Sequence, residues 1–354
     1  MSDGITIQSH KGPYAVSFDE GALSRLNGNV PDNAHFIIDA KVADLYRDDL
    51  AVVRASSSVL LIEATEDNKS LDKFPAYVDH LVGNKIRRDH VLIAIGGGII
   101  QDITCFLSAT LLRGVSWQFY PTTLLAQADS CIGSKSSINS GAAKNILGTF
   151  TPPSEIHLAT RFLDTLDERD VRSGVGEMIK VHVIDGPASF DAIAADYENL
   201  FSNRAIMVRY IRRALEIKKG YIERDEFDQG PRNIFNYGHS FGHAIEAATG
   251  FAIPHGIAVT IGMDMANWCS WKKGIGNEDN YRRMHDVLAA NYRGFAATPV
   301  PVDPFIAAIS KDKKNVDGDV TLILPDGESR VFRDRYPNDD RFRDLCAEYL
   351  RNCR

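Results

Sequence analysis

The sequence predicts an α/β Rossmann-like nucleotide-binding domain followed by a mainly α-helical, metal-binding domain. In the first half, short apolar runs alternate with amphipathic stretches, and a triple glycine, Gly96-Gly97-Gly98, joins a predicted strand to a predicted helix. From about residue 165 onward the pattern is mostly helical. Because 354 residues exceed one typical core, we expect two domains, 1–165 and 166–354.

The elements of the first half follow from hydrophobic periodicity. Apolar runs at 35–39, 58–64 and 90–98 predict strands of a buried parallel sheet. Residues 69–86 carry apolar side chains at helical spacing, and 99–114 predict a helix that ends at Gly114. The following VSWQFYPTT predicts another strand. Strand, helix and strand in this order predict a βαβ architecture, in which ligands bind at the carboxyl ends of the strands.

The second half is predicted to be helical, with one exception. Helical periodicity covers residues 164–180, 204–226, 239–250 and 255–274. The exception is VTLILPDG (320–327), which is typical of a strand that runs into a turn.

Composition excludes several classes of function. The net charge of −7 and the pI of about 5.8 argue against a general nucleic-acid binder. The five cysteines form no CxxC pair, which disfavours a disulfide framework or a cysteine-built zinc site. The N-terminus has no signal-peptide pattern, and no apolar run is long enough to span a bilayer. We therefore expect a cytoplasmic protein with neither membrane nor nucleic acid as a partner.

Three histidines and one glutamate suggest a metal site. His239 and His243 are four residues apart, so a helix would place them on one face, and His255 returns directly after Pro254. Imidazole nitrogens suit first-row metals, and Glu177 in GVGEMIK would supply a carboxylate. The alternative is that His239 and His243 are a solvated pair on a helix.

The triple glycine suggests a nucleotide site. Without Cβ atoms, the turn lets the backbone approach a pyrophosphate, which the N-terminus of a helix favours. It departs from G-x-G-x-x-G because Gln101 stands where the last glycine would. The alternative is a tight turn that needs positive φ. Asp39, at the end of an earlier strand, either binds a ribose hydroxyl or caps the next element.

The segment 121–150 suggests an anion site. It places Asp129, Lys135, Lys144 and Asn145 among small residues, although a solvated loop has a similar composition. Lysine and asparagine side chains on such a segment suit a phosphate. Further polar residues precede the histidines: Lys180, Lys218, Arg232 and Asn236. Together they describe a pocket with a metal and several cations, suited to a polyhydroxylated, doubly anionic substrate.

With these segments in view, the chain resembles 3-dehydroquinate synthase and the wider family of sugar phosphate cyclases, from about Asp39 to Lys314. The resemblance is carried by GGGIIQD, TLLRGVSWQFYPTTLLAQADSCIGSK, AAKNILGTF, GEMIK, RNIFNYGHSFGHAIE and PHG, in the family's order and nearly its spacing.

The resemblance implies roles for individual residues. It implies Glu177, His239 and His255 as ligands of Zn²⁺ or Co²⁺, with His243 beside the metal near the substrate phosphate. It implies catalytic roles for Asp129, Lys135, Lys180 and His243. The implied NAD contacts are Asp39, Glu66, Lys69, Gly97, Gly98, Asp102, Thr122, Thr123, Leu125, Asp129, Thr165 and Leu166. The implied substrate contacts are Arg113, Lys144, Asn145, Lys218, Arg232, Asn236, Lys313 and Lys314. Arg113 matches an arginine that reaches the neighbouring subunit's site, which implies a homodimer.

The implied chemistry returns NAD⁺ unchanged. A substrate alcohol is oxidised, inorganic phosphate is eliminated, the ketone is reduced again, and an intramolecular aldol addition closes a carbocycle. The protein would contribute to this reaction by orienting the substrate and by placing charged groups around it.

Several residues depart from the family's pattern. Gln101 replaces a glycine at the pyrophosphate turn, and Ser134, Ser136, Ser137 and Ser140 replace Gly, Thr, Gly and His. Ile257 replaces a glutamate after the third ligand. These changes suggest a divergent or secondary-metabolism branch of the family.

Lys218 and Arg232 nevertheless match the family's pair for a substrate carboxylate, so we expect a phosphorylated sugar acid, a heptulosonate 7-phosphate. The alternatives are a cyclase for a neutral ketose phosphate such as sedoheptulose 7-phosphate, an NAD-dependent metal polyol dehydrogenase, and a relative that has lost catalysis.

Overall fold

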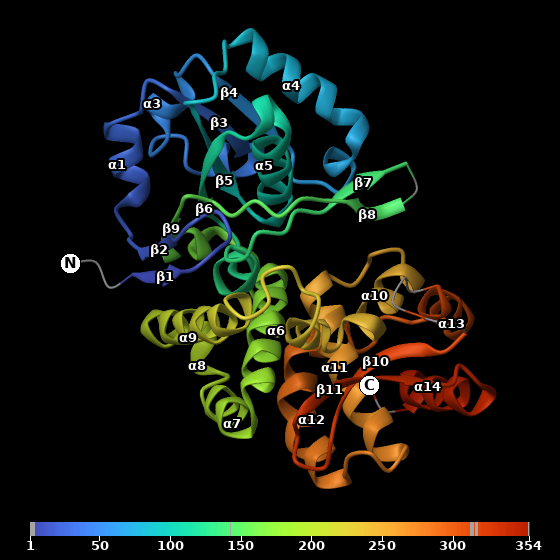
Figure 1. Ribbon diagram of the computed structural model, residues 1–354. Helices are drawn as coiled ribbons and strands as arrows, with labels where there is room; N and C mark the ends of the chain where they lie inside the picture. The colour runs from blue at the N-terminus through green and yellow to red at the C-terminus, as the bar shows by residue number, and fades with distance from the viewer. Residues whose placement is uncertain (1–3, 142, 312–314, 316–317, 353) are drawn as a thin grey trace. The chain divides into compact units, whose positions relative to one another are not determined.

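The computed structural model describes residues 4–141, 143–311, 315, 318–352 and 354, which form two compact units (Figure 1). The first unit comprises the described residues of Met1–Leu166 and Lys218–Phe227, and the second those of Asp167–Ile217 and Asp228–Arg354. The segment 218–227 therefore belongs to the first unit, although the sequence-based division placed it in the second domain. Lys218 Nζ donates a hydrogen bond to the carbonyl oxygen of Asp129, and Glu226 accepts hydrogen bonds from Ser9 and His10, which ties this segment to the first unit.

The first unit is built on a seven-stranded sheet. In spatial order its strands are β1 (Ile5–Ile7), β2 (Tyr14–Phe18), β9 (Glu155–Leu158), β6 (Ser116–Pro121), β5 (Val91–Gly96), β3 (Ala34–Asp39) and β4 (Val59–Ile62). All neighbouring strands are parallel except β1 and β2, which are antiparallel. The predicted parallel sheet is confirmed, and β1, β2 and β9 extend it beyond the strands that the apolar runs predicted.

The core of the first unit follows the alternation of side chains along the strands. Phe36 and Ile38 of β3 and Ile93 and Ile95 of β5 are fully buried in one cluster with residues that include Leu23. Residues two apart share a face of a strand, so this cluster occupies one face of the sheet.

The helices of the first unit connect these strands. They are α1 (Ala22–Gly28), α2 (Ala40–Leu45), α3 (Ala51–Arg54), α4 (Phe74–Gly83) and α5 (Gly98–Thr110), with the short turns η1 (Asp67–Lys69), η2 (Leu71–Lys73), η3 (Leu111–Arg113), η4 (Ala126–Ser130) and η5 (Thr160–Thr165). The helix predicted to reach Gly114 ends at Thr110, because Leu112 and Arg113 adopt left-handed backbone angles that an α-helix cannot continue.

The segment 121–150 is more structured than its composition indicated. Residues 126–130 form η4, a single turn of π-helix. A two-stranded hairpin follows, made of β7 (Ile138–Ser140) and β8 (Ala143–Leu147). Small residues permit these tight turns as readily as they permit an irregular loop, which is why composition alone left the alternatives open.

The second unit is mainly helical, as predicted. Its helices are α6 (Glu168–Asp185), α7 (Pro187–Ala195), α8 (Asn199–Ser202), the first part of α9 (Arg204–Ile222), α10 (His239–Ala248), α11 (His255–Lys272), α12 (Glu278–Tyr292), α13 (Val302–Ser310) and α14 (Asp340–Asn352), with the turns η6 (Pro231–Asn236) and η7 (Arg293–Phe295). The predicted strand is β10 (Val320–Pro325), which pairs antiparallel with β11 (Val331–Tyr336), a strand that the sequence reading missed.

Close packing brings α6 and α11 together. A Cβ atom built on Gly256, in the first turn of α11, would collide with the carbonyl oxygen of Ser173 on α6. The amide of Gly256 also donates a hydrogen bond to Ser173 Oγ (2.9 Å). Because a glycine occupies this position, the two backbones approach more closely than a side chain would allow.

The described cysteines are buried and free. They are Cys105 and Cys131 in the first unit and Cys269 and Cys346 in the second. Burial raises the pKa of Cys105 and of Cys131 to about 12. Among the described residues, no helix combines the length and apolar character needed to cross a membrane.

Candidate functional site

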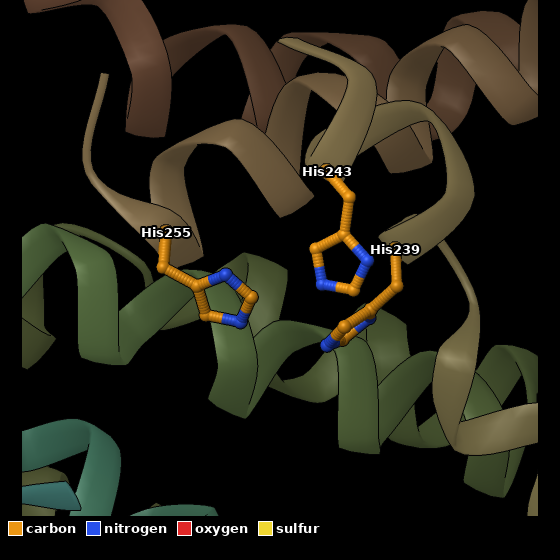
Figure 2. Close-up of side chains that lie close together, drawn as sticks. All are labelled: His239, His243 and His255. Carbon is orange, nitrogen blue, oxygen red and sulfur yellow. The ribbon is translucent and has the colours of Figure 1, made fainter. Parts of the chain in front are cut away.

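Three imidazole rings from α10 and α11 point toward one another (Figure 2). Each of His239, His243 and His255 offers a ring nitrogen within 4.8 Å of those of the other two. The helical spacing of four residues places His239 and His243 on one face, as the sequence predicted. The solvated-pair alternative is thereby disfavoured, because the third histidine comes from a different helix.

Local backbone chemistry sets where these helices begin. Gly238 has a φ of 77°, a left-handed conformation that favours glycine, and His239 is the first residue of α10. Pro254 is extended, and His255 is the first residue of α11. Two of the three imidazoles therefore project from the first residue of a helix.

Glu177 of α6 completes the cluster. Its side chain is almost fully buried, and its Oε1 lies 3.5 Å from His239 Nε2 and 3.4 Å from His255 Nε2. This oxygen has no hydrogen-bond partner among the described residues. Burial alone would raise the pKa of Glu177, but the charge of Lys180 and the neighbouring His255 outweigh it and hold the pKa well below its usual range. The site therefore keeps an ionised carboxylate facing two imidazoles.

Glu246 is a site residue that the sequence reading missed. Its Oε2 lies 3.2 Å from His255 Nδ1, so His255 stands between two carboxylates. Burial lowers the pKa of His255, but Glu177 and Glu246 outweigh it and raise the pKa to about 10. Glu246 follows His239 and His243 at helical spacing on α10, so the pattern that identified the histidines also contained this residue.

The other predicted residues of the second unit are cationic or amide side chains. Lys180 is buried one helical turn after Glu177, and its Nζ lies 2.6 Å from Glu177 Oε2. Arg232, which is buried, and Asn236 belong to η6. Lys313 and Lys314, also predicted to bind substrate, lie outside the described residues.

In the first unit, the triple glycine leads from β5 into α5. None of the three glycines has a positive φ, so the tight-turn alternative is not supported. A Cβ on Gly96 would collide with Ile100 and one on Gly97 with Thr123, whereas Gly98 faces open space. No side chain caps the N-terminus of α5. The first turn of this helix therefore combines room for a ligand with backbone N–H groups that favour an anion.

Thr122, Thr123 and Leu125 follow β6 beside this turn. The amide of Thr122 donates a hydrogen bond to the carbonyl oxygen of Gly96 (2.9 Å). Thr123 Oγ1 accepts one from the amide of Ala126 (3.2 Å). The structure thus brings these residues to the carboxyl ends of β5 and β6, together with the glycines.

A polar network joins predicted cofactor residues to a predicted substrate residue. Lys69 Nζ, which is buried, donates hydrogen bonds to Asp102 Oδ2 and to Asn145 Oδ1, both at 3.1 Å. Glu66 Oε1 lies 3.5 Å from the same Nζ. Burial raises the pKa of Asp102 to about 6, although Lys69 and the amide of Ser137 oppose this effect. Four of the predicted residues therefore share one network.

Asp129 and Lys218 form a second cluster. Lys218 Nζ lies 2.5 Å from Asp129 Oδ1 and donates a hydrogen bond to the Asp129 carbonyl oxygen at 2.6 Å. Both side chains are buried. The buried lysine thus offsets the carboxylate charge.

The further predicted residues of the first unit differ in burial and in contacts. Asp39 accepts a hydrogen bond from the amide of Lys41 (2.9 Å) and caps α2, as the simpler alternative proposed, and burial raises its pKa. Thr165 Oγ1 lies 3.1 Å from the hydroxyl of Tyr46. Four others are partly or fully exposed: Lys135, Lys144, Leu166 and Arg113, the last in a left-handed backbone conformation.

Two sequence profiles match consecutive parts of the chain. A profile described as 3-dehydroquinate synthase N-terminal matches residues 59–173, and one described as 3-dehydroquinate synthase C-terminal matches residues 174–315. The 3-dehydroquinate synthase of Paracoccus denitrificans (strain Pd 1222) is 34% identical over 335 residues, which cover 90% of this chain and 91% of the relative.

Two solved structures share the fold. A 2-deoxy-scyllo-inosose synthase complexed with carbaglucose-6-phosphate, NAD⁺ and Co²⁺ superposes with a TM-score of 0.82 at 20% identity, covering 98% of this chain and 99% of that one. A 2-epi-5-epi-valiolone synthase from Streptomyces hygroscopicus subsp. jinggangensis 5008, with NAD⁺ and Zn²⁺ bound, superposes with a TM-score of 0.80 at 27% identity, covering 95% and 96%. These comparisons confirm the predicted fold class.

Proposed function

Because the chain belongs to the 3-dehydroquinate synthase family, we propose that it is an NAD- and metal-dependent sugar phosphate cyclase. Its preferred substrate would be a heptulosonate 7-phosphate, which it would convert to a carbocycle with release of inorganic phosphate. The cytoplasmic location and the homodimer expected from the sequence remain predictions.

The observation that carries this proposal is the buried oxygen of Glu177 opposite two imidazoles. Ligands about 2 Å from a tetrahedral metal lie roughly 3.3 Å apart. Glu177 Oε1 lies 3.4 and 3.5 Å from the Nε2 atoms of His255 and His239. This oxygen has no hydrogen-bond partner among the described residues, as expected for an oxygen that binds a cation. We therefore assign Glu177, His239 and His255 as the ligands, with His243 beside them.

The start of α5 supports NAD as the second cofactor. An added Cβ has open space at Gly98, and the first N–H groups of the helix lack a side-chain cap. A pyrophosphate would bind there through backbone groups and through the partial positive charge of the helix end. When bound, NAD⁺ supplies a hydride acceptor and the metal supplies a Lewis acid that acidifies a hydroxyl group.

The chain's own residues bind and orient the substrate in this proposal. Lys180 holds Glu177 ionised, which keeps the metal ligand ready. Lys135, Lys144 and His243 would supply positive charge or hydrogen bonds for the phosphate. Buried side chains such as Lys180 and Glu177 would hold their groups in a fixed geometry, and such preorganisation would supply much of the rate enhancement.

The substrate carboxylate would be recognised by Lys218 and Arg232, both buried cations. Lys218 is held in place by Asp129, so the position of its ammonium group is fixed. A neutral ketose phosphate has no group for such a pair. That absence favours the heptulosonate over the sedoheptulose alternative, although the four serine replacements in residues 134–140 lie in the segment expected to face the substrate.

The deciding experiment measures phosphate release by the purified, metal-loaded protein with NAD⁺. 3-Deoxy-D-arabino-heptulosonate 7-phosphate and sedoheptulose 7-phosphate are supplied in parallel, and absorbance reports NADH. We expect phosphate from the acid and no net NADH.

Phosphate release from sedoheptulose 7-phosphate alone would identify the neutral ketose phosphate as the substrate instead. Net NADH without phosphate would instead identify a polyol dehydrogenase. No reaction with either compound, despite bound metal and NAD⁺, would contradict catalysis on both of these substrates.

A further inference from the structure

Gln101 makes two hydrogen bonds to one residue. Its Nε2 donates to the carbonyl oxygen of Ser130 (2.6 Å), and Ser130 Oγ donates to its Oε1 (2.7 Å). Only 5% of Gln101 is exposed. Instead of occupying the space at the glycine turn, the side chain is directed to the end of η4.

Ser130 immediately follows Asp129, whose carbonyl and carboxylate oxygens both contact Lys218 Nζ. The π-helical turn that carries both residues is anchored by side chains. Gln127 Nε2 donates to the carbonyl oxygens of Pro121 (3.0 Å) and Ala159 (2.9 Å). Lys218 anchors the turn to α9, and Gln101 anchors it to α5. Single π-helical turns contain an extra residue and recur at functional sites, so anchors of this kind decide where their side chains lie.

Gln101 lies in the first turn of α5, which begins at Gly98. The same helical turn thus offers backbone N–H groups to a nucleotide and, through Gln101, holds the segment that carries Asp129. A residue without this amide would leave the carbonyl and hydroxyl groups of Ser130 without these partners and the turn without its link to α5.

We propose that Gln101 is a positioning residue that clamps Ser130 to α5 and thereby fixes Asp129 and Lys218 for substrate binding. The inference rests on the proposed function, because it assigns the Asp129–Lys218 pair to the substrate. It also explains how this chain uses a large side chain where the family resemblance leads one to expect glycine.

The test compares Gln101→Ala with Ser108→Ala. Ser108 is buried on the same helix and donates a hydrogen bond to the Val115 carbonyl oxygen (2.5 Å), so its variant loses a buried bond away from η4. We expect amide hydrogen exchange in residues 126–131 to accelerate about tenfold in Gln101→Ala, and not in Ser108→Ala.

Kinetics provide the second measurement. With the phosphorylated substrate that the wild type uses, Gln101→Ala should raise KM about tenfold, corresponding to the loss of a buried hydrogen bond. Its kcat should change little, and Ser108→Ala should leave KM unchanged. Ser130→Ala removes one of the two hydrogen bonds, so its KM and its exchange rate should lie between those of the wild type and Gln101→Ala. If Gln101→Ala does not fold, Ser130→Ala takes its place in the comparison.

Equal exchange rates in residues 126–131 for Gln101→Ala and Ser108→Ala would overturn the clamp. Accelerated exchange with an unchanged KM would overturn the positioning role and leave a purely structural bond. If the wild type releases no phosphate from any sugar phosphate tested, the proposed function fails. The exchange comparison still decides whether Gln101 holds the turn.

Discussion

A single imidazole, His255, shows how neighbouring side chains prepare a ligand. Its Nδ1 lies beside Glu246 Oε2 and its Nε2 beside Glu177 Oε1. Once His255 is deprotonated, as a metal ligand must be, a carboxylate that holds Nδ1–H leaves the lone pair of Nε2 for the metal and restrains rotation of the ring. In the proposed metal site, Glu246 would therefore orient His255 without binding the metal itself.

Replacing Glu246 with glutamine tests this support. The amide oxygen can still accept a hydrogen bond, but the negative charge is lost, so we expect the affinity for Zn²⁺ to fall about tenfold. Competition with a chromophoric chelator measures this directly, without any assay of activity. Glu278→Gln is the matched control, because Glu278 is a glutamate at the start of α12 that pairs with Arg282. Equal affinities in both variants would contradict the role of Glu246.

At the scale of elements, the proposed metal site depends on how closely α6 and α11 pack. Glu177 and His255 come from these two helices, and Gly256 beside His255 is the point where their backbones approach. The neighbouring atom is the carbonyl oxygen of Ser173 within α6, which cannot rotate away as a flexible side chain would.

Gly256→Ala should therefore separate the two helices. Overpacking of this kind costs roughly 1–3 kcal/mol of the free energy of unfolding. We also expect weaker metal binding, because the displacement moves His255 relative to Glu177. Thermal unfolding and metal titration measure the two effects. Gly294→Ala is the control, since an added Cβ there meets open space; if the two variants behaved alike, the close approach would have no energetic importance.

The sequence predicted long periodic elements better than short ones. Strands β3 and β5 and helices α10 and α11 follow from runs of residues whose burial has a clear period. The hairpin of β7 and β8 escaped prediction because its strands are short and the second strand is mostly exposed. The end of α5 was misplaced because Leu112 and Arg113 adopt left-handed backbone angles, which their residue types do not predict.

The sequence predicted that the histidines and Glu177 lie together, which they do, but it did not predict the contacts of Gln101. A helical spacing constrains which residues share a face, so His239, His243 and Glu246 were within reach of sequence reasoning. The bond from Gln101 to Ser130 joins residues 29 apart in different elements, and it depends on a π-helical turn. Tertiary packing decides such contacts, and no local pattern encodes them.

At the scale of the whole molecule, buried histidines couple stability to pH. Burial lowers the pKa of His182 to about 4 from 6.5. Its ring is almost fully buried, with Nδ1 2.9 Å from Ser189 Oγ. Because the folded pKa is depressed, the folded state favours the neutral ring. Its contribution to stability is present above pH 6.5 and is lost as the pH falls toward 4.

We therefore expect the free energy of unfolding to fall between pH 6.5 and pH 4, with His182 accounting for up to about 3 kcal/mol. His182→Asn cannot ionise in this range, so its stability should depend less steeply on pH. Denaturant titrations at a series of pH values measure both slopes. Parallel curves for the variant and the wild type would show that His182 does not titrate in this way.

The buried thiols can report when individual parts of the folded protein open. Cys131 directly follows Ser130, and burial keeps its thiol both inaccessible and protonated near neutral pH. An alkylating reagent therefore modifies Cys131 only when the segment around it opens, whereas Cys269 and Cys346 report the second unit. Mass spectrometry of the labelled peptides would time these openings separately, in the unmodified wild-type chain and without any added fluorophore.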